Sequence, residues 1–377
     1  MNHCLKRNLI RWMIGPIIFA AGFVLLRLSH AHQAFAIWYA NNIYPVFVHT
    51  IGRFVGIFPF SVFEVVLIAL ILSTFGLIVF TIVNLCTFKG RSRLREFMKS
   101  HAITTIRYLL NVASVLFLMF VLSAGINYNR ESFAYHVGIT VEASSADELV
   151  QLYMILVERA HELAPQIKTD ADGHFMLRRE NMYDYARRSM MELNELHGGL
   201  VSYFPPAKGL FLSRELLSNL NIAGFFSPWT IEANYNADMP GQSIPFVVNH
   251  ELAHVSGHMR EDEANFIAYL AGRNSDNIDF RYSAVYTSIG YVLNALRTAV
   301  STERYQELFS LLPEQMRRDF ANARAYWQAF QGPAADLSVR VNDAYLRANR
   351  QDDGVRSYGR MVDLLLAYYR ELGMITN

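Results

Sequence analysis

Cysteine is almost absent from this chain of 377 residues, which contains only Cys4 and Cys86. A disulfide framework and a zinc site made of cysteines are therefore excluded, so any bound metal must be held by histidine, aspartate or glutamate. An excess of charge of either sign is also missing, because the formal net charge is +1 at pH 7. This balance gives no electrostatic basis for binding nucleic acid, and we expect no nucleic-acid partner.

Strand signals are scarce after the first third of the chain, whereas helical patterns are abundant. Apolar residues recur with helical spacing over 144–166, and the stretch 182–199 ends in two glycines that predict a helix end. Only 199–213 and 224–236 are aromatic-rich and bounded by glycine or proline, as short strands are. We therefore predict a mainly α fold with a few short strands.

Long apolar runs are abundant in the first third of the chain. Hydrophobic residues make up 52 % of the sequence, the mean hydropathy is +0.15, and residues 65–83 and 108–126 contain no charge. Each of these runs is close to the ~20 residues that cross a bilayer as a helix. With a shorter apolar run at 12–26, they predict three N-terminal transmembrane helices in a lipid bilayer, at about 9–28, 62–85 and 107–127.

The first run allows two interpretations, because basic residues precede it. We interpret it as an uncleaved anchor, although a secretory signal cleaved after Ala36 also fits. The stretch 87–107 carries six lysines and arginines and one acidic residue. Between the first two spans, after Arg27, the only lysine or arginine is Arg53. The excess predicts that the N-terminus and 87–107 are cytoplasmic. We expect a membrane domain over 1–127 and an extracytoplasmic domain over 128–377.

The motif His-Glu-x-x-His begins at His250. Residues four apart lie on one face of a helix, so His250 and His254 can direct their rings at one ion. Glu251 lies about 100° around the axis and can take a proton from water that the ion activates. Pro245 and Gly257 fit the first turn and the end of such a helix. The spacing predicts a Zn²⁺ site with Glu251 as general base.

A third ligand is needed, because this motif occurs by chance in on the order of a few per cent of chains this long. His258 continues the same face, but two turns of helix from His250 to His258 span about 12 Å, too far for bonds of about 2.0–2.1 Å. We expect His258 at the surface. The position of the third histidine in metzincin proteases is Arg260 here, and a protonated guanidinium cannot bind a metal.

Two glutamates follow in a segment that predicts a second helix. In several gluzincin families the third ligand is the glutamate of an E-x-x-A-[DN] motif, and residues 261–265, EDEAN, match it. We prefer Glu261 as the ligand, with Asn265 hydrogen-bonded beside the metal site. Glu263 is the alternative ligand, and both glutamates could also be exposed caps of a short helix.

The chain resembles an uncharacterised bacterial domain-of-unknown-function family of membrane-anchored, zincin-like proteins. The resemblance covers most of the chain, from three spans ending in GINYNRESFA through GFFSPWTIEANYN, PFVVNHELAHVSGHMREDEANFIAYLAG and VNDAYLRANRQDDGVRSYGRMVDLLLAYY. It implies a gluzincin-type zinc site at His250, His254 and a downstream glutamate, with Glu251 as base. It also implies a mostly helical, zincin-like extracytoplasmic domain, but no established activity.

Two further segments are candidates for the site. Residues 230–236, TIEANYN, could form a strand that holds an extended substrate through Glu232 and Asn234, or a turn whose asparagines cap backbone groups. Tyr358 could donate a hydrogen bond to an oxyanion, or be one of the many packing tyrosines in a chain that has 20.

The function predicted from these observations is a membrane-anchored zinc hydrolase, a metallopeptidase acting on a peptide or protein substrate in the extracytoplasmic space. The alternative is a membrane-tethered binding or scaffold protein of the cell envelope, with a structural or vestigial metal site. A structural site is closed by four protein ligands, and only three good ligands are found nearby, which favours catalysis. An intramembrane protease is not expected, because the motif lies far past the last span.

Overall fold

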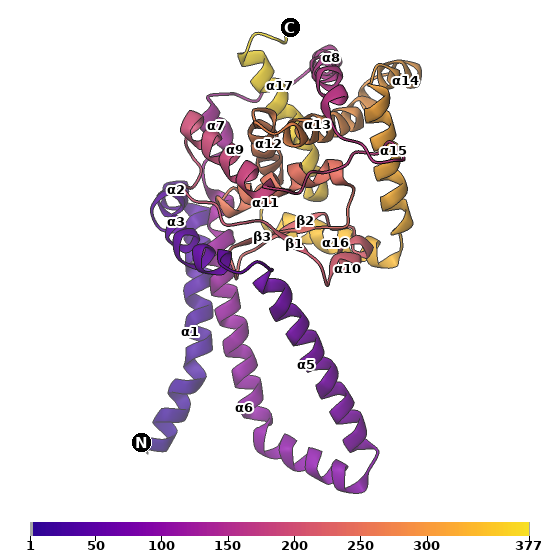
Figure 1. Ribbon diagram of the computed structural model, residues 1–377. Coiled ribbons are helices and arrows are strands. Elements are labelled where there is room, and N and C mark those ends of the chain that lie inside the picture. Colours follow the sequence, from indigo (N-terminus) through magenta and orange to yellow (C-terminus); the bar gives the residue numbers. More distant parts are fainter. Residues whose placement is uncertain (1–2, 377) are drawn as a thin grey trace.

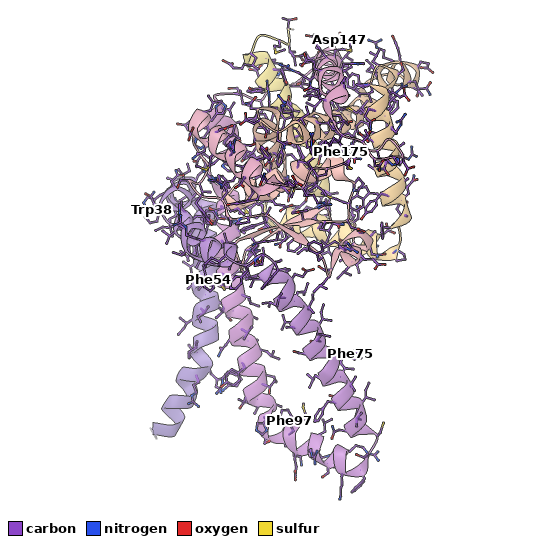
Figure 2. The ribbon with its side chains drawn as sticks, in the orientation of Figure 1. Trp38, Phe54, Phe75, Phe97, Asp147 and Phe175 are labelled. Carbon is purple, nitrogen blue, oxygen red and sulfur yellow. The ribbon has the colours of Figure 1, made fainter. Side chains whose placement is uncertain are left out.

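The computed structural model describes the backbone of residues 3–376 and the side chains of residues 11–376. Helices make up 73 % and strands 4 % of it, which confirms the mainly α fold. Figure 1 shows a stalk of three long helices beneath a head of shorter helices and a small sheet. Phe75 and Phe97 lie on the stalk, whereas Asp147 and Phe175 belong to the head (Figure 2).

The stalk consists of α1 (His3–Ala31), α5 (Val62–Leu85) and α6 (Phe88–Phe120), each long and apolar enough to cross a membrane. Close packing of α1 on α6 depends on Gly22, because a Cβ there would lie 3.1 Å from the ring of Phe117. None of the apolar window of α5 is buried. The three helices therefore support membrane association, with α5 the most exposed of them.

α6 begins earlier than the sequence predicts. The third span is expected to begin at about residue 107, but the helix starts at Phe88, where the hydroxyl of Thr87 accepts a hydrogen bond from the N–H of Gly90 at 3.0 Å. This stretch contains several basic side chains together with Leu94, Phe97 and Met98 and has no proline, which favours a helix at a membrane boundary. Figure 1 shows this first part running across the lower end of the stalk before α6 turns towards the head. A π-helical turn, η2 (Val121–Gly125), extends α6 into the head.

The segment between α1 and α5 belongs to the head, although the sequence predicts a membrane domain over 1–127. It forms α2 (Gln33–Asn42), α3 (Tyr44–Phe47), η1 (Val48–Gly52) and α4 (Arg53–Gly56). Ala36, Tyr44 and Val48 are fully buried and join the hydrophobic cluster of the head. A fragment that starts at residue 128 would therefore lack part of its core.

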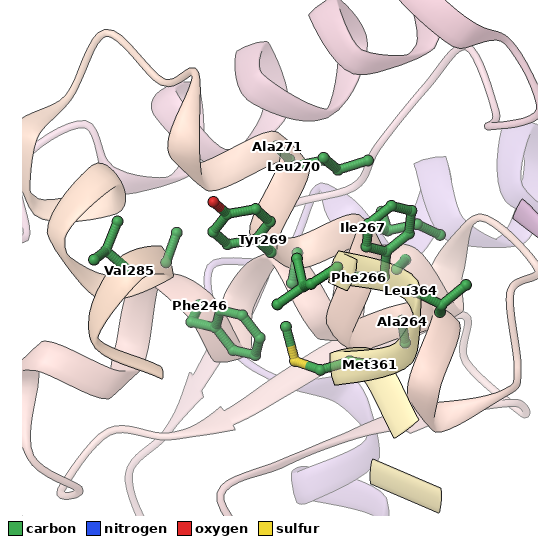
Figure 3. Packing of buried hydrophobic residues seen from close by; sticks show 14 of the residues in the cluster. Phe246, Ala264, Phe266, Ile267, Tyr269, Leu270, Ala271, Val285, Met361 and Leu364 are labelled. Atoms are coloured by element: carbon green, nitrogen blue, oxygen red, sulfur yellow. The ribbon is translucent and has the colours of Figure 1, made fainter. Parts of the chain in front are cut away.

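Helices of the head surround a buried centre at α12. They are η3 (Asn127–Asn129), α7 (Phe133–Val137), α8 (Ala146–Leu163), η4 (Ala164–Gln166), α9 (Met182–His197), α10 (Arg214–Asn219), η5 (Gly241–Ser243), α11 (Ile244–Val255), α12 (Glu261–Arg273), α13 (Ile278–Ala299), α14 (Thr302–Ser310), α15 (Glu314–Ala329), α16 (Pro333–Ala348), η6 (Gly354–Arg360) and α17 (Met361–Glu371). Residues 261–272 of α12 are all buried. Figure 3 shows Phe266 and Tyr269 of α12 between Phe246 of α11, Val285 of α13 and Met361 of α17.

The small sheet lies beside α11. Its strands are β1 (Lys208–Leu210), β2 (Gly224–Ser227) and β3 (Glu232–Asn236), in the order β1-β3-β2. β1 is parallel to β3 and β2 is antiparallel to it, with Phe225 opposite Asn234. Both aromatic-rich stretches thus contain strands, as predicted, and β3 is the central one.

Candidate metal centre

α11 carries the His-Glu-x-x-His motif through the middle of the head. Pro245 lies in its first turn, where a missing N–H costs nothing, and Gly257 adopts φ +87° just past its end. The hydroxyl of Tyr44 donates to the carbonyl of Val255 at 2.9 Å, and Arg130 donates to the next carbonyl at 3.2 Å. The segment between α1 and α5 and the segment after α6 thus hold the end of the motif helix.

The two histidines of the motif face a common point. The ring centroids of His250 and His254 are 4.6 Å apart, and the ring planes are nearly perpendicular, at 88°. Because the chain turns back at Gly257, Glu261 at the start of α12 meets them. Its Oε2 lies 3.1 Å from Nε2 of His250 and 3.4 Å from Nε2 of His254. All three residues are buried, with 7–8 % of each exposed.

Hydrogen bonds on the far side of each ring determine which nitrogen faces Glu261. Nδ1 of His250 donates to Oδ1 of Asn265 at 2.8 Å, and the Asn265 amide is oriented by its own donation to a backbone carbonyl of η6 at 3.1 Å. Nδ1 of His254 donates to the carbonyl of His258 at 2.8 Å. Each neutral ring thus presents the lone pair of Nε2 to a carboxylate oxygen that can only accept. Three such atoms repel one another unless a cation or a proton lies between them.

This arrangement fits a tetrahedral divalent metal. Two ligand atoms about 2.0–2.1 Å from zinc are ~3.3 Å apart at the tetrahedral angle, and the nitrogen–oxygen distances in this site are 3.1 and 3.4 Å. Oε2 of Glu261 and Oε2 of Glu251 are buried without a hydrogen-bond partner, as expected of atoms whose partners are an ion and its water. Among the described residues, no fourth histidine, cysteine or carboxylate joins His250, His254 and Glu261. One position on such a metal would therefore stay open.

The side chains of His250, His254 and Glu261 share one proton at neutral pH. Burial acts to lower the pKa of His254, but the charge of Glu261 raises this pKa to about 9. Burial likewise acts to raise the pKa of Glu261, yet His254 and His250 hold it at about 2. Burial lowers the pKa of His250, so the proton resides on His254 at neutral pH. Burial also raises the pKa of Glu251 to about 8, and a nearby cation would return this base to its ionised form.

Glu251 lies against β2 at a position where only glycine fits. A Cβ on Gly224 would lie 2.6 Å from Oε1 of Glu251 and 2.7 Å from Cγ1 of Val247. The contact places the edge strand β2 directly beside the expected base. Sequence reasoning misses Gly224, although a glycine that opens an aromatic-rich strand is a signal for a close approach of this kind.

His258 and Glu263 form a separate pair. The sequence predicts His258 at the surface, which is wrong, because the residue is fully buried. Its Nδ1 lies 3.4 Å from Oε2 of Glu263, and its Nε2 lies 3.0 Å from a carbonyl in the loop after α9. Glu263 also pairs with Arg260 at 3.2 Å, away from the motif histidines. The structure thus brings Glu261 and not Glu263 to those histidines, and neither glutamate is an exposed cap.

Tyr358 lies next to the site, on η6. Its ring stacks on that of His250, with the centroids 6.3 Å apart. Burial, and after it the charge of Glu261, raises the pKa of Tyr358. The hydroxyl therefore keeps its proton at neutral pH and can donate a hydrogen bond.

Three more tyrosines, which sequence reasoning misses, lie on the same side. The hydroxyl of Tyr128 donates to that of Tyr345 at 3.0 Å, and Tyr291 accepts from the amide of Asn265 at 3.2 Å. Burial raises the pKa of Tyr345 to about 12, and the charge of Glu261 adds to this effect. These residues come from η3, α13 and α16, and nothing in their spacing singles them out.

Within residues 230–236, Glu232–Asn236 form the strand β3, but its contacts are not those that the sequence suggests. β3 is paired with β1 on one side and β2 on the other, so it has no free edge for a substrate. The carboxylate of Glu232 accepts from the N–H groups of Val62 and Phe63, both at 2.9 Å, and caps α5. Asn234 is fully buried and donates to the carbonyl of Glu232 at 3.2 Å. The sheet edge nearest to Glu251 is β2.

Comparisons with known proteins identify a family and nothing finer. No curated protein and no solved structure matches the chain. The family model described as Protein of unknown function (DUF3810) matches residues 39–366, a range that runs from α2 to α17 and includes His250, His254 and Glu261. The resemblance to a domain-of-unknown-function family is thereby confirmed, whereas its zincin-like and membrane-anchored character stays a prediction. The chain belongs to the DUF3810 family of proteins of unknown function.

Proposed function

We propose that the chain is a membrane-anchored zinc-dependent hydrolase, a metallopeptidase of the gluzincin type. The observation that carries this proposal is the convergence of Nε2 of His250, Nε2 of His254 and Oε2 of Glu261 at distances that suit one tetrahedral ion. Two imidazoles and a carboxylate are a ligand set of catalytic zinc sites. Zinc held there would activate a water molecule and polarise a substrate carbonyl.

Glu251 would act as general base. Its Oε2 is buried and unpartnered, and its Oε1 is held against Gly224. It can therefore accept a proton from the attacking water and deliver it to the leaving nitrogen. The hydroxyl of Tyr358 would donate a hydrogen bond to the oxyanion. An extended substrate would pair with the edge of β2 beside this base.

The head would lie outside the cytoplasm. The first part of α6 carries Lys89, Arg91, Arg93, Arg95 and Lys99 at the end of the stalk that is remote from the head (Figure 1). Lysine and arginine next to a span favour the cytoplasmic side. The substrate would accordingly be a peptide or protein in the extracytoplasmic space.

A binding or scaffold protein with a structural metal is the second candidate, favoured by the low exposure of the three ligands. Structural zinc sites are closed by four protein ligands. Only three converge among the described residues, so we infer the catalytic function.

The test uses the full chain in detergent or nanodiscs, because α2–α4 contribute to the core of the head. We expect stoichiometric zinc and cleavage of members of a peptide library. Glu251→Gln should keep zinc and lose cleavage, whereas His254→Ala should lose both. Glu263→Gln is the matched control and should keep both. A folded wild-type chain without stoichiometric metal would exclude the zinc site, and metal whose removal unfolds a head that cleaves no peptide would favour the scaffold.

A further inference from the structure

An apolar patch on the head surrounds the end of α5 that meets the head. We call it the collar, and it consists of Phe54, Ile57, Phe60, Phe211 and Leu212, which are 48–76 % exposed. Figure 2 shows Phe54 where the head joins the stalk. Contiguous exposed apolar surface on a folded domain usually marks a partner or a membrane.

The collar is one surface, although its residues come from two distant segments. The ring of Phe58 lies 5.8 Å from that of Phe54 and 5.6 Å from that of Phe60. Phe58 and Phe211 also line one shared cavity. The ammonium group of Lys208 donates to the carbonyl of Phe58 and ties the two segments together.

Hydrogen bonds hold the collar at the first turn of α5. The N–H groups of Leu212 and Ser213 donate to Oε1 of Glu64 at 3.0 and 2.8 Å. The carboxylate of Glu232 in β3 accepts hydrogen bonds from the first N–H groups of α5 and caps that helix. The charge-free stretch of α5 begins directly after Glu64 and runs over 65–83. Leu212 is therefore held where the hydrocarbon of a bilayer crossed by α5 must begin.

We propose that the collar lies in the outer leaflet of the bilayer that the stalk crosses, at the boundary between headgroups and acyl chains. Lipid is the occupant because the collar is continuous with α5, whose apolar window has no buried residue. Exposed Arg53 next to Phe54, and exposed Arg179 in the lining of the shared cavity, suit the phosphates of lipid headgroups. The contact fixes the height of the head above the membrane. It depends on the membrane crossing of the stalk and is independent of any metal.

Depth-dependent fluorescence of a single label tests this contact. The full chain is prepared with Cys4→Ser and Cys86→Ser, and Leu212→Cys is labelled with an environment-sensitive fluorophore in nanodiscs that hold one copy. Leu372→Cys is the matched control, because Leu372 is 49 % exposed and follows α17, which ends on the side of the head away from the stalk (Figure 1).

We expect blue-shifted emission at position 212 and quenching by lipids that carry a nitroxide near the headgroup, with neither effect at position 372. A repeat with Phe211→Cys should give the same result. Water-like emission without quenching at 212 would overturn the proposal. Shielding of 212 that appears only when two copies share a disc would also overturn it, since the collar would then be an interface between copies.

Discussion

Replacing Glu261 by glutamine should remove both a proposed metal ligand and the main cause of the raised pKa of His254. In the wild type His254 carries a proton at neutral pH, because the charge of Glu261 outweighs burial and raises the pKa to about 9. A divalent ion must displace that proton. The apparent affinity for zinc should therefore rise with pH up to about 9 and level off above it. One displaced proton corresponds to about tenfold in affinity, or ~1.4 kcal/mol, per pH unit.

In Glu261→Gln the imidazole of His254 loses the largest of the effects that raise its pKa, while burial, which lowers that pKa, remains. Zinc affinity should be weaker at every pH, and its rise with pH between about 7 and 9 should be smaller by the one proton that His254 no longer holds. Glu263→Gln is the matched control. Its carboxylate faces His258 and Arg260, so the wild-type slope should persist.

Competition with a chromophoric chelator, corrected for the chelator's own protonation, measures these affinities. Circular dichroism at each pH shows whether the variants stay folded. If the full wild-type slope survives in Glu261→Gln, or if the slope decreases in a folded Glu263→Gln, the assignment of the proton and of the third ligand is refuted.

Single contacts elsewhere in the head give three further expectations. Gly224→Ala should slow peptide hydrolysis by roughly tenfold to 100-fold with unchanged zinc content, because the new methyl group displaces the carboxylate of the base. An equal loss in Gly290→Ala, whose Cβ would meet nothing closer than 3.5 Å, would contradict this. Tyr44→Phe should cost roughly 1–3 kcal/mol by leaving a buried carbonyl unpaired, which faster hydrogen exchange at the end of α11 but not in α8 would reveal. The hydrogen bond from Arg370 lowers the pKa of Glu148 from 4.5 to about 2. This pair therefore stabilises the fold above pH 4.5, and its contribution is lost as the pH falls towards 2. The thermal midpoints of the wild type and Arg370→Met should differ at neutral pH and converge in acid.

The features that depend on near neighbours in the chain can be predicted from the sequence. The i, i+4 spacing of His250 and His254 places both rings on one face, and a glycine after the motif lets the chain turn back. The match of residues 261–265 to a gluzincin pattern points to Glu261 and Asn265, and the structure places both against the histidines. The three apolar spans depend only on hydropathy and length.

The features that sequence reasoning gets wrong depend on contacts between distant segments. His258 reads as an exposed residue after a helix end, and its burial requires Glu263 and the loop after α9. Glu232 reads as a polar residue of a substrate strand, yet its partners are the first N–H groups of α5, 169 and 170 residues earlier. Hydropathy locates α1 and α5. It does not show that Tyr44, between them in the sequence, donates a hydrogen bond to the carbonyl of Val255 at the end of α11. In each case a tertiary contact overrides the local pattern.

X-ray absorption at the zinc edge, on the full-length chain in nanodiscs, tests the metal centre most directly. We expect stoichiometric zinc with two imidazole nitrogens and only oxygen otherwise, at about 2.0–2.2 Å, and loss of that spectrum in Glu261→Gln. Zinc with sulfur ligands, or a folded chain that binds no divalent metal, would contradict a centre formed by His250, His254 and Glu261.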